Sequence, residues 1–302
     1  MALPVVHHPA YTAVLPTEHR FPMRKFAALA DTLLAEGIVA PGGFHEPAAP
    51  APQAWIELVH DRAYVDQVLA GEVPPAIERE IGLPVTGAIV RRALYACAGT
   101  VLSGRLALRH GIASNTAGGG HHARPERGAG FCVFNDVAIA VRVLQSGGLI
   151  ERALVVDLDV HQGDGTAAIF AGDPSASTFS MHSERNYPSR KVASDLDIGL
   201  PDRTGDDAYL AALADALPRL LDHACPDIVF YNAGVDPHRN DRLGRLALSD
   251  QGIEARDLFV IDAVRRRSIP LAGIIGGGYS DDVAALARLH ASLHRTAATF
   301  VG

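Results

Sequence analysis

Five short apolar segments recur along the chain, each bounded by glycine or polar residues. They cover residues 112–118, 152–158, 177–182, 227–234 and 270–276. Between most of them lie patterns typical of helices, such as 136–148, which opens with an aspartate suited to N-capping and closes with glycines. Apolar strands that alternate with helices predict a parallel sheet covered on both faces, which is a three-layer α/β fold.

The length of 302 residues, with 48% hydrophobic content, is enough for a large core. Chains of this fold class often form one unit at this length, so we expect a single domain over residues 1–302. One segment rich in proline and alanine, residues 39–53, is a candidate linker. It comes early in the chain, and we therefore expect a surface loop rather than a domain boundary.

Charge and cysteine content exclude several classes of protein. The net charge is −7 without any basic block, which argues against a nucleic-acid partner. None of Cys97, Cys132 and Cys225 sits in a CxxC pair, so we expect neither a disulfide framework nor a zinc ribbon. No run of 18 apolar residues and no leader-like start are present, which predicts a cytoplasmic protein without a membrane partner.

Polar side chains collect where the apolar segments end. The segment at 152–158 runs into "DLDVHQGDG", and residues two apart on an extended strand share a side, so Asp157, Asp159 and His161 point together. A second segment ends at Asp236. Two carboxylates and an imidazole form a three-ligand site with an open position, the pattern of a catalytic zinc. We therefore predict that Asp159, His161 and Asp236 bind a metal.

Two further segments end in the same way. Residues 112–118 lead into His121 and His122, and residues 270–276 lead into Tyr279. Each piece alone has an ordinary explanation as a helix cap, a surface pair or a tight turn. The glycine runs lack the spacing of nucleotide-binding loops. In parallel sheets, however, ligands bind at the carboxyl ends of the strands, and here these ends carry compatible chemistry.

The motifs resemble the zinc-dependent histone deacetylase and acetylpolyamine amidohydrolase family. The matching segments are "GGGHHARPERGAGFCVFND" (118–136), "VVDLDVHQGDGT" (155–166), "NAGVD" (232–236) and "GGGY" (276–279). Tyr187 and Leu243 make the chain look most like class IV members and their bacterial relatives. The resemblance implies an arginase/deacetylase-like domain with a central, mainly parallel eight-stranded sheet.

The resemblance also implies a role for each matching residue. Zinc on Asp159, His161 and Asp236 would act as a Lewis acid. His122 would be the general base and acid, His121 its electrostatic partner or a proton donor, and Tyr279 the oxyanion donor. Asp157 and Asp164 would hydrogen-bond His121 and His122 respectively. Two sets complete the assignment: Gly130, Phe131, Tyr187 and Leu243 as the substrate tube, and Asp157, Asp159, His161, Ser180 and Met181 as a structural K⁺ or Na⁺ site.

Several alternatives remain open at this point. We expect removal of an acetyl or longer acyl group from lysine on a protein, with an acetylpolyamine or other small acylated amine as the rival substrate. Leu243, Phe131 and Tyr187 predict an apolar rim, which favours acyl-lysine, although no peptide-gripping aspartate can be placed in residues 79–87. A two-metal ureohydrolase and a non-catalytic acyl-binding module fit less well. Fe²⁺ could replace Zn²⁺, and the sequence leaves acyl length and oligomeric state undetermined.

Overall fold

A computed structural model describes residues 2–16 and 18–301 of the chain. Its described residues form one all-parallel sheet of seven strands in the order β1-β2-β7-β6-β3-β4-β5. The strands are β1 (Val5–Val6), β2 (Ile112–Asn115), β3 (Ala153–Asp157), β4 (Ala176–Ser183), β5 (Leu196–Leu200), β6 (Ile228–Asn232) and β7 (Leu271–Ile274). The expected single-domain α/β fold with a central parallel sheet is confirmed.

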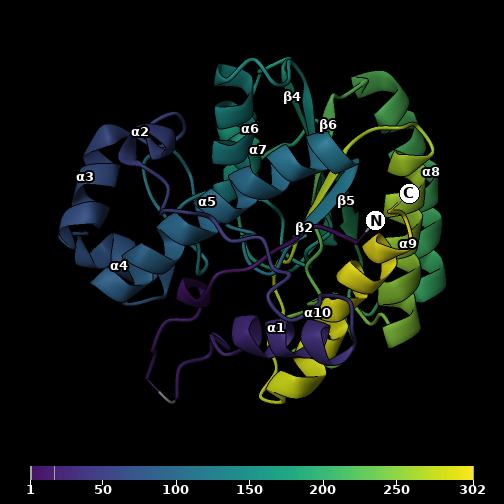
Figure 1. The fold of residues 1–302 in the computed structure, drawn as a ribbon, viewed down its shortest axis with the longest axis horizontal. Coiled ribbons are helices and arrows are strands. Elements are labelled where there is room, and N and C mark those ends of the chain that lie inside the picture. Colours follow the sequence, from purple (N-terminus) through teal and green to yellow (C-terminus); the bar gives the residue numbers. More distant parts are fainter. Residues whose placement is uncertain (1, 17, 302) are drawn as a thin grey trace.

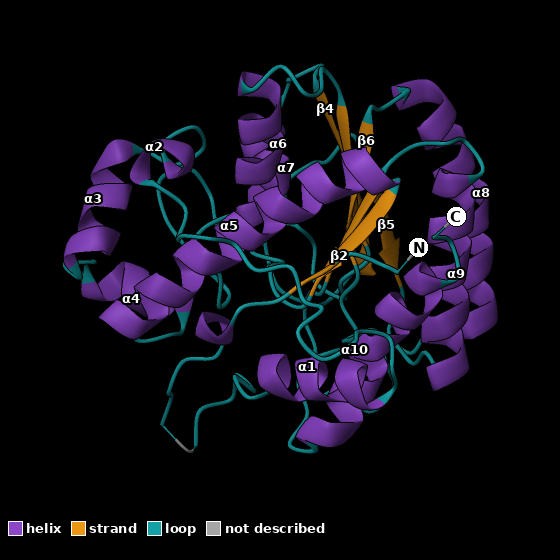
Figure 2. Cartoon of the chain, viewed as in Figure 1, coloured by secondary structure: helices purple, strands orange, loops and turns teal. Residues whose placement is uncertain are grey.

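Helices cover both faces of this sheet (Figures 1 and 2). On one face lie α5 (Gly87–His110), α6 (Asp136–Ser146) and α7 (Asp164–Phe170). The other face carries α1 (Lys25–Ala35), α8 (Asp206–Ala224), α9 (Asp250–Arg265) and α10 (Val283–Ala298). This arrangement encloses the central strands β3 and β6, every residue of which is buried. The expected three layers are therefore present.

The strand count differs from the eight that the family resemblance implies. All five apolar segments become strands, while β1 and β5 were not anticipated. β1 has only two residues, and β5 alternates between more and less exposed positions instead of forming an apolar run. Beyond β1, one parallel bridge between Val6 and His45 extends the pairing without forming a further strand. The sheet thus ends at the β1 edge with only a few paired residues.

The order of the strands creates a crevice at the centre of the sheet. From β3 the chain moves outward to β4 and β5, then returns to place β6 on the other side of β3. Connections that leave neighbouring strands in opposite directions open a crevice beyond their carboxyl ends, where ligands bind. The loops that follow β3 and β6 meet at this point.

A group of shorter helices lies beside α5, away from the sheet (Figure 1). It consists of α2 (Gln53–Ile56), α3 (Arg62–Ala70) and α4 (Pro75–Ile81), while a short 3₁₀ helix, Pro9–Tyr11, precedes α1. Residues 39–52 lead into α2 without helix or strand beyond the His45 bridge, as expected of a loop. Among the described helices, none combines the length and the apolar character that crossing a membrane requires.

Candidate functional site

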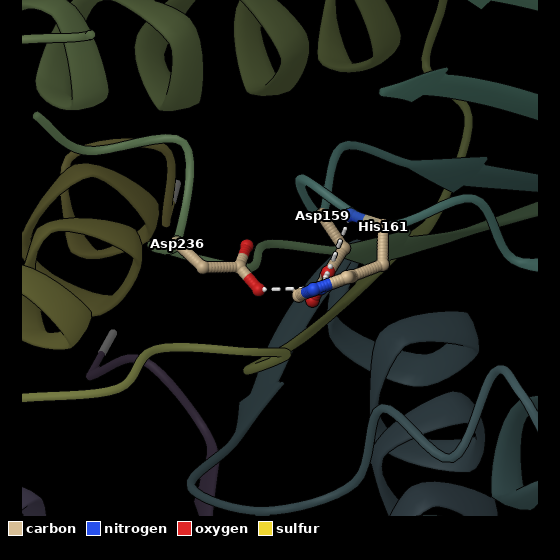
Figure 3. A group of neighbouring side chains, drawn as sticks. All are labelled: Asp159, His161 and Asp236. Atoms are coloured by element: carbon tan, nitrogen blue, oxygen red, sulfur yellow. Dashed lines mark hydrogen bonds and ion pairs between the residues drawn. The ribbon is translucent and has the colours of Figure 1, made fainter. Parts of the chain in front are cut away.

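The three predicted metal ligands meet at the central crevice. Asp159 and His161 follow β3, and Asp236 follows the neighbouring β6. Their ligand atoms all lie within 4.8 Å of one another, and all three side chains are buried (Figure 3). The alternation of side chains along the extended segment after β3 brings Asp159 and His161 to the same side, as the sequence pattern predicts.

Hydrogen bonds hold the two carboxylates in a fixed orientation. His161 Nδ1 lies 3.0 Å from Asp159 Oδ1 and 3.1 Å from Asp236 Oδ2. The other oxygens accept backbone N–H groups, Asp159 Oδ2 from Gly277 at 2.6 Å and Asp236 Oδ1 from Val160 at 2.8 Å. A Cβ atom on Gly277 would lie 2.0 Å from Asp236 Oδ2, so only glycine permits this close approach.

Two buried carboxylates in contact require a positive charge between them. Burial and the negative charge of Asp159 raise the pKa of Asp236 to about 7. Burial works against a charge on His161, but its bonds to Asp159 and Asp236 outweigh that effect and raise its pKa to about 10. A proton on His161 thus balances the charge here. Because the donor set is two oxygens and one nitrogen, a divalent cation fits the same place.

Two histidine–aspartate pairs lie beside this group. His121 Nδ1 is 2.7 Å from Asp157 Oδ2, and His122 Nδ1 is 2.6 Å from Asp164 Oδ1. Both imidazoles are buried, with ring centroids 4.0 Å apart. These are the two pairings that the resemblance implies. In each pair the aspartate fixes the orientation of the ring and leaves Nε2 available for chemistry.

The two histidines differ in charge because their surroundings differ. For His121, burial lowers the pKa, but the charges of Asp157 and Asp159 outweigh it and raise the pKa to about 9. For His122, burial and the neighbouring positive charge of His121 lower the pKa to about 4, despite Asp164. Near neutral pH, His121 is therefore positively charged and His122 is a neutral proton acceptor.

Tyr279 closes the other side of the group. Its ring centroid lies 6.1 Å from that of His161, and its backbone N–H donates to Asp241 Oδ2 at 2.7 Å. Burial, followed by the charges of Asp159 and Asp236, raises the pKa of its hydroxyl well above the usual value. The hydroxyl therefore stays protonated and able to donate a hydrogen bond.

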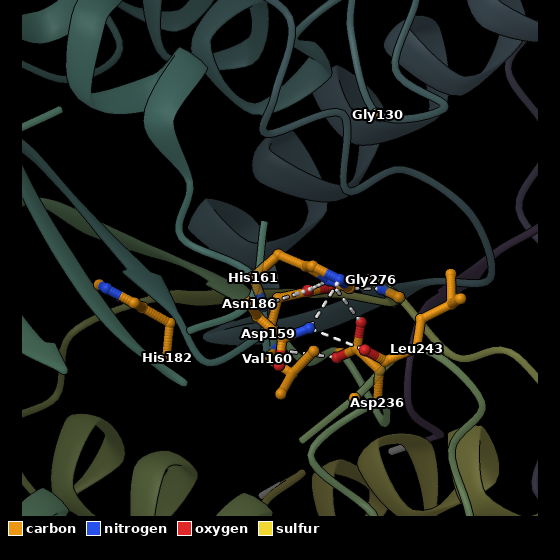
Figure 4. Close-up of polar contacts among 12 residues, drawn as sticks. Gly130, Asp159, Val160, His161, His182, Asn186, Asp236, Leu243 and Gly276 are labelled. Atoms are coloured by element: carbon orange, nitrogen blue, oxygen red, sulfur yellow. Dashed lines mark hydrogen bonds and ion pairs between the residues drawn. The ribbon is translucent and has the colours of Figure 1, made fainter. Parts of the chain in front are cut away.

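The predicted substrate-binding residues line one cavity. This cavity has a volume of about 390 Å³ and includes Gly130, Phe131, Tyr187 and Leu243 in its walls. His122, His161 and Tyr279 lie at its inner end, which we call the floor together with Asp159 and Asp236. Figure 4 shows the metal group with Leu243 beside it and Gly130 on a separate loop above it in the view. A Cβ atom on Gly130 would lie 2.4 Å from His122 Cδ2, so a side chain there would displace the histidine.

The outer part of the cavity is not the apolar rim that the sequence predicts. Phe131, Tyr187 and Leu243 form the walls, but the lining also includes one glutamate and several arginines. We call the following four residues the mouth: Arg20, Arg79, Arg185 and Arg245. They come from four separate segments, three of which are far from residue 243 in the chain, and reasoning from Leu243 alone missed all four.

The residues of the predicted monovalent-cation site lie on adjacent strands. Asp157 in β3 pairs in register with Ser180 in β4, and Met181 follows. Ser180 Oγ lies 3.0 Å from His182 Nδ1, and His182 points away from the metal group (Figure 4). That these residues bind a monovalent ion together with Asp159 and His161 stays a prediction.

Several residues that sequence reasoning missed support the site. Arg124 donates to Asp164 Oδ2 at 2.6 Å, and Asn232 donates to Asp157 Oδ1 at 2.9 Å. Lys25 is buried and donates to the carbonyl of Gly276 at 3.0 Å, just before Tyr279. Asn186 Nδ2 lies 3.4 Å from His161 Nε2. Asn232 and Arg124 lie inside the quoted motifs, and this position was the sequence signal that could have identified them.

Gln162 has a structural position beside the metal group. Its side-chain nitrogen donates to the carbonyl of Val192 and to Asp197, each at 2.8 Å, and its oxygen accepts from the N–H of Val192 at 3.0 Å. The side chain thus fastens the loop before β5 to the segment after β3.

Comparisons with known proteins identify the relatives of this chain. The family model described as the histone deacetylase domain matches residues 19–295. Histone deacetylase 2 of Arabidopsis thaliana is 30% identical over 86% of this chain and 70% of its own length. A probable deacetylase of Methanothermobacter thermautotrophicus is 29% identical over 75% of this chain and 71% of its own.

Two further similarities cover nearly the whole chain. An uncharacterized protein of Picosynechococcus is 50% identical over 98% of this chain and 99% of its own length. The crystal structure of the HDA15 HD domain superposes with a TM-score of 0.76 at 21% identity, covering 97% of this chain and 88% of that one, and supports the fold. Given the matched family model, the chain belongs to the histone deacetylase family.

Proposed function

We propose that this deacetylase-family protein is a zinc-dependent hydrolase that removes an acyl group from acyl-lysine. The observation that carries the proposal is that the three candidate ligands lie together and that one of them, His161, lines the same walled cavity as His122 and Tyr279. Zn²⁺ bound by Asp159, His161 and Asp236 would supply a Lewis acid that polarises an amide carbonyl and acidifies water.

The side chains of the floor would then divide the proton transfers. His122 is neutral, so its Nε2 can take a proton from the attacking water and later deliver it to the leaving amine. His121, held by Asp157, would be its electrostatic partner or a proton donor. Tyr279 would donate its hydroxyl to the oxyanion. Asp164 keeps the ring of His122 in place throughout.

The walls support a lysine-like substrate. Phe131, Tyr187 and Leu243 surround a passage suited to methylene groups, and Phe131 is held in a left-handed backbone conformation with φ of 66°. Its N–H donates to the carbonyl of Ile81 at 2.6 Å, which ties this wall to the end of α4. The strained position is fixed from outside and does not depend on the substrate.

A second, smaller cavity supports a short acyl group. It has a volume of about 50 Å³ and shares Gly130, Phe131 and Tyr279 with the larger cavity. Such a space holds only a few non-hydrogen atoms, since one water needs about 10–15 Å³ of volume measured in this way. Acetyl is therefore the acyl group we propose first.

The test is the activity of metal-quantified protein towards a panel of acyl-lysine peptides and acetylated polyamines. The proposal predicts turnover of acetyl-lysine peptides that depends on one bound metal. Repeating the measurement with protein loaded with Zn²⁺ or with Fe²⁺ would decide between the two metals. Preference for acetylpolyamines by tenfold or more, about 1.4 kcal/mol in the transition state, would contradict the choice of lysine.

A further inference from the structure

The four arginines of the mouth fall into two pairs, one beside α4 and one around Asp202. Arg79 belongs to α4, and Arg20 is next to His19, whose Nε2 lies 3.0 Å from the carbonyl of Gly82 just after α4. Arg185 and Arg245 lie 3.9 Å and 3.3 Å from the same carboxylate oxygen of Asp202. One pair is therefore at the end of α4, and the other is around Asp202.

Positive charge exceeds negative charge at this mouth. Glu80 also lines the cavity, but its carboxylate is 3.1 Å from Arg127 and is thus already paired. Asp202 is the single carboxylate that pairs with both Arg185 and Arg245. Within the described ranges 2–16 and 18–301, Arg20 and Arg79 form no ion pair with a carboxylate. The whole chain has a net charge of −7, so the mouth has the opposite sign to the molecule.

Clustered positive charges around a cavity repel cations and attract anions. Field lines concentrate where a polar entrance has low-dielectric walls, and Phe131, Tyr187 and Leu243 are such walls. A lysine that enters between these walls leaves its backbone at the mouth, with neighbouring residues extending towards both arginine pairs. A small anion would meet one pair, whereas a chain segment with acidic residues on both sides can meet two.

We propose that the substrate is an acyl-lysine within an acidic protein segment, with carboxylates on both sides of the modified residue. This inference rests on the proposed function and specifies its substrate class. The mouth disfavours a basic tail, or a polyamine with free ammonium groups, because these would bring positive charge next to Arg20 and Arg79.

Three acetyl-lysine peptides of equal length test the proposal. Their flanking residues are aspartate, glutamine or arginine on both sides, and kcat/KM is measured at low and at high salt. Exposed ion pairs contribute roughly two- to fivefold each, so the acidic peptide should exceed the glutamine peptide by roughly tenfold. Salt shortens the range of these interactions, and the ratio should fall towards one at high ionic strength. Equal rates at low salt would overturn the proposal.

Variants assign the preference to the mouth. The double change Arg20→Gln and Arg79→Gln should reduce the acidic-to-glutamine ratio several-fold. The matched control, Arg219→Gln with Arg266→Gln, removes the same charge from α8 and from the end of α9. These helices lead into the amino ends of β6 and β7, whereas the site lies beyond the carboxyl ends of the strands. The ratio should be unchanged in this control. A preference that survives the first change and not the second would overturn the assignment.

Binding separates failure of the proposal from failure of the proposed function. Absence of hydrolysis of all three peptides would contradict the deacylase, whereas fluorescence anisotropy of the labelled peptides on metal-loaded Tyr279→Phe protein tests the mouth without turnover. The acidic peptide should bind several-fold more tightly than the arginine peptide, and equal affinities would refute the acidic substrate class. Free Nε-acetyl-lysine represents a small-molecule substrate. A higher kcat/KM for this compound than for the acidic peptide would refute a protein substrate.

Discussion

The floor and the mouth of the same cavity differ in charge, burial and origin. At the floor, Asp159, His161 and Asp236 are buried, and each carboxylate oxygen has a hydrogen-bond partner. At the mouth, Arg185 and Arg245 have side chains that are 76% and 55% exposed. Charges in a buried, fully bonded group are held in one geometry, whereas exposed arginines keep most of their freedom. The floor is therefore suited to chemistry, and the mouth to selection of substrates.

This difference predicts that changes at the floor abolish function while changes at the mouth alter preference. The largest effect should come from a ligand. Asp159→Ala or His161→Ala should reduce bound metal from about one equivalent to near zero and remove activity, because two of three ligands cannot hold the ion. Elemental analysis of protein purified without added metal measures this directly. Two equivalents of transition metal in the unaltered protein would instead favour a two-metal centre.

The oxyanion donor should come next. Tyr279→Phe removes one hydroxyl and keeps the ring that packs 5.8 Å from Phe131, so metal content and fold should persist. Loss of one oxyanion donor costs roughly 10²–10³-fold in kcat. Steady-state kinetics with an amide substrate provide the measurement. Turnover near that of the unaltered protein would mean that Tyr279 only packs against the wall.

The sequence was sufficient to bring the three candidate metal ligands of the floor together, because strand geometry determines their positions. Alternation along the segment after β3 sets Asp159 and His161 on one side, and parallel pairing of β3 with β6 brings Asp236 beside them. The same reasoning anticipated five of the seven strands, β2, β3, β4, β6 and β7, and the helices that cover them. The edge strand β5 was not predicted, because a partly exposed strand does not form an apolar run.

The mouth could not be predicted in this way. Arg20, Arg79, Arg185 and Arg245 lie on loops and on α4, and no periodicity connects segments so far apart in the chain. The argument from Leu243 and its apolar neighbours predicted an apolar rim around the cavity. Long-range packing, such as the contact between His19 and Gly82, brings these segments together and is visible only in the folded chain.

An intermediate effect is expected from Arg124, which supports the floor from outside and which sequence reasoning passed over. Its guanidinium holds Asp164, and Asp164 orients His122. Arg124→Ala should lower kcat roughly tenfold with little change in KM, because partners one step from the reacting groups typically cost 10–100-fold. Arg127→Ala is the matched control, since Arg127 is three residues away and pairs with Glu80 instead. Equal losses of kcat in both variants would show that Arg124 does not act through His122.

The smallest effect should come from one arginine of the mouth, and its response to salt sharpens the contrast with the floor. Arg79→Gln should raise KM for an acidic acetyl-lysine peptide roughly two- to fivefold at low salt, the usual contribution of one exposed ion pair. Because the Debye length shrinks from about 10 Å at 0.1 M to about 3 Å at 1 M salt, this effect should disappear at high salt. The loss in Arg124→Ala should persist there, since Asp164 and His122 are buried and poorly screened. Measuring both variants across one salt series tests the division. If the Arg79→Gln effect were as large in 1 M salt as in dilute buffer, this arginine would act by packing rather than by charge.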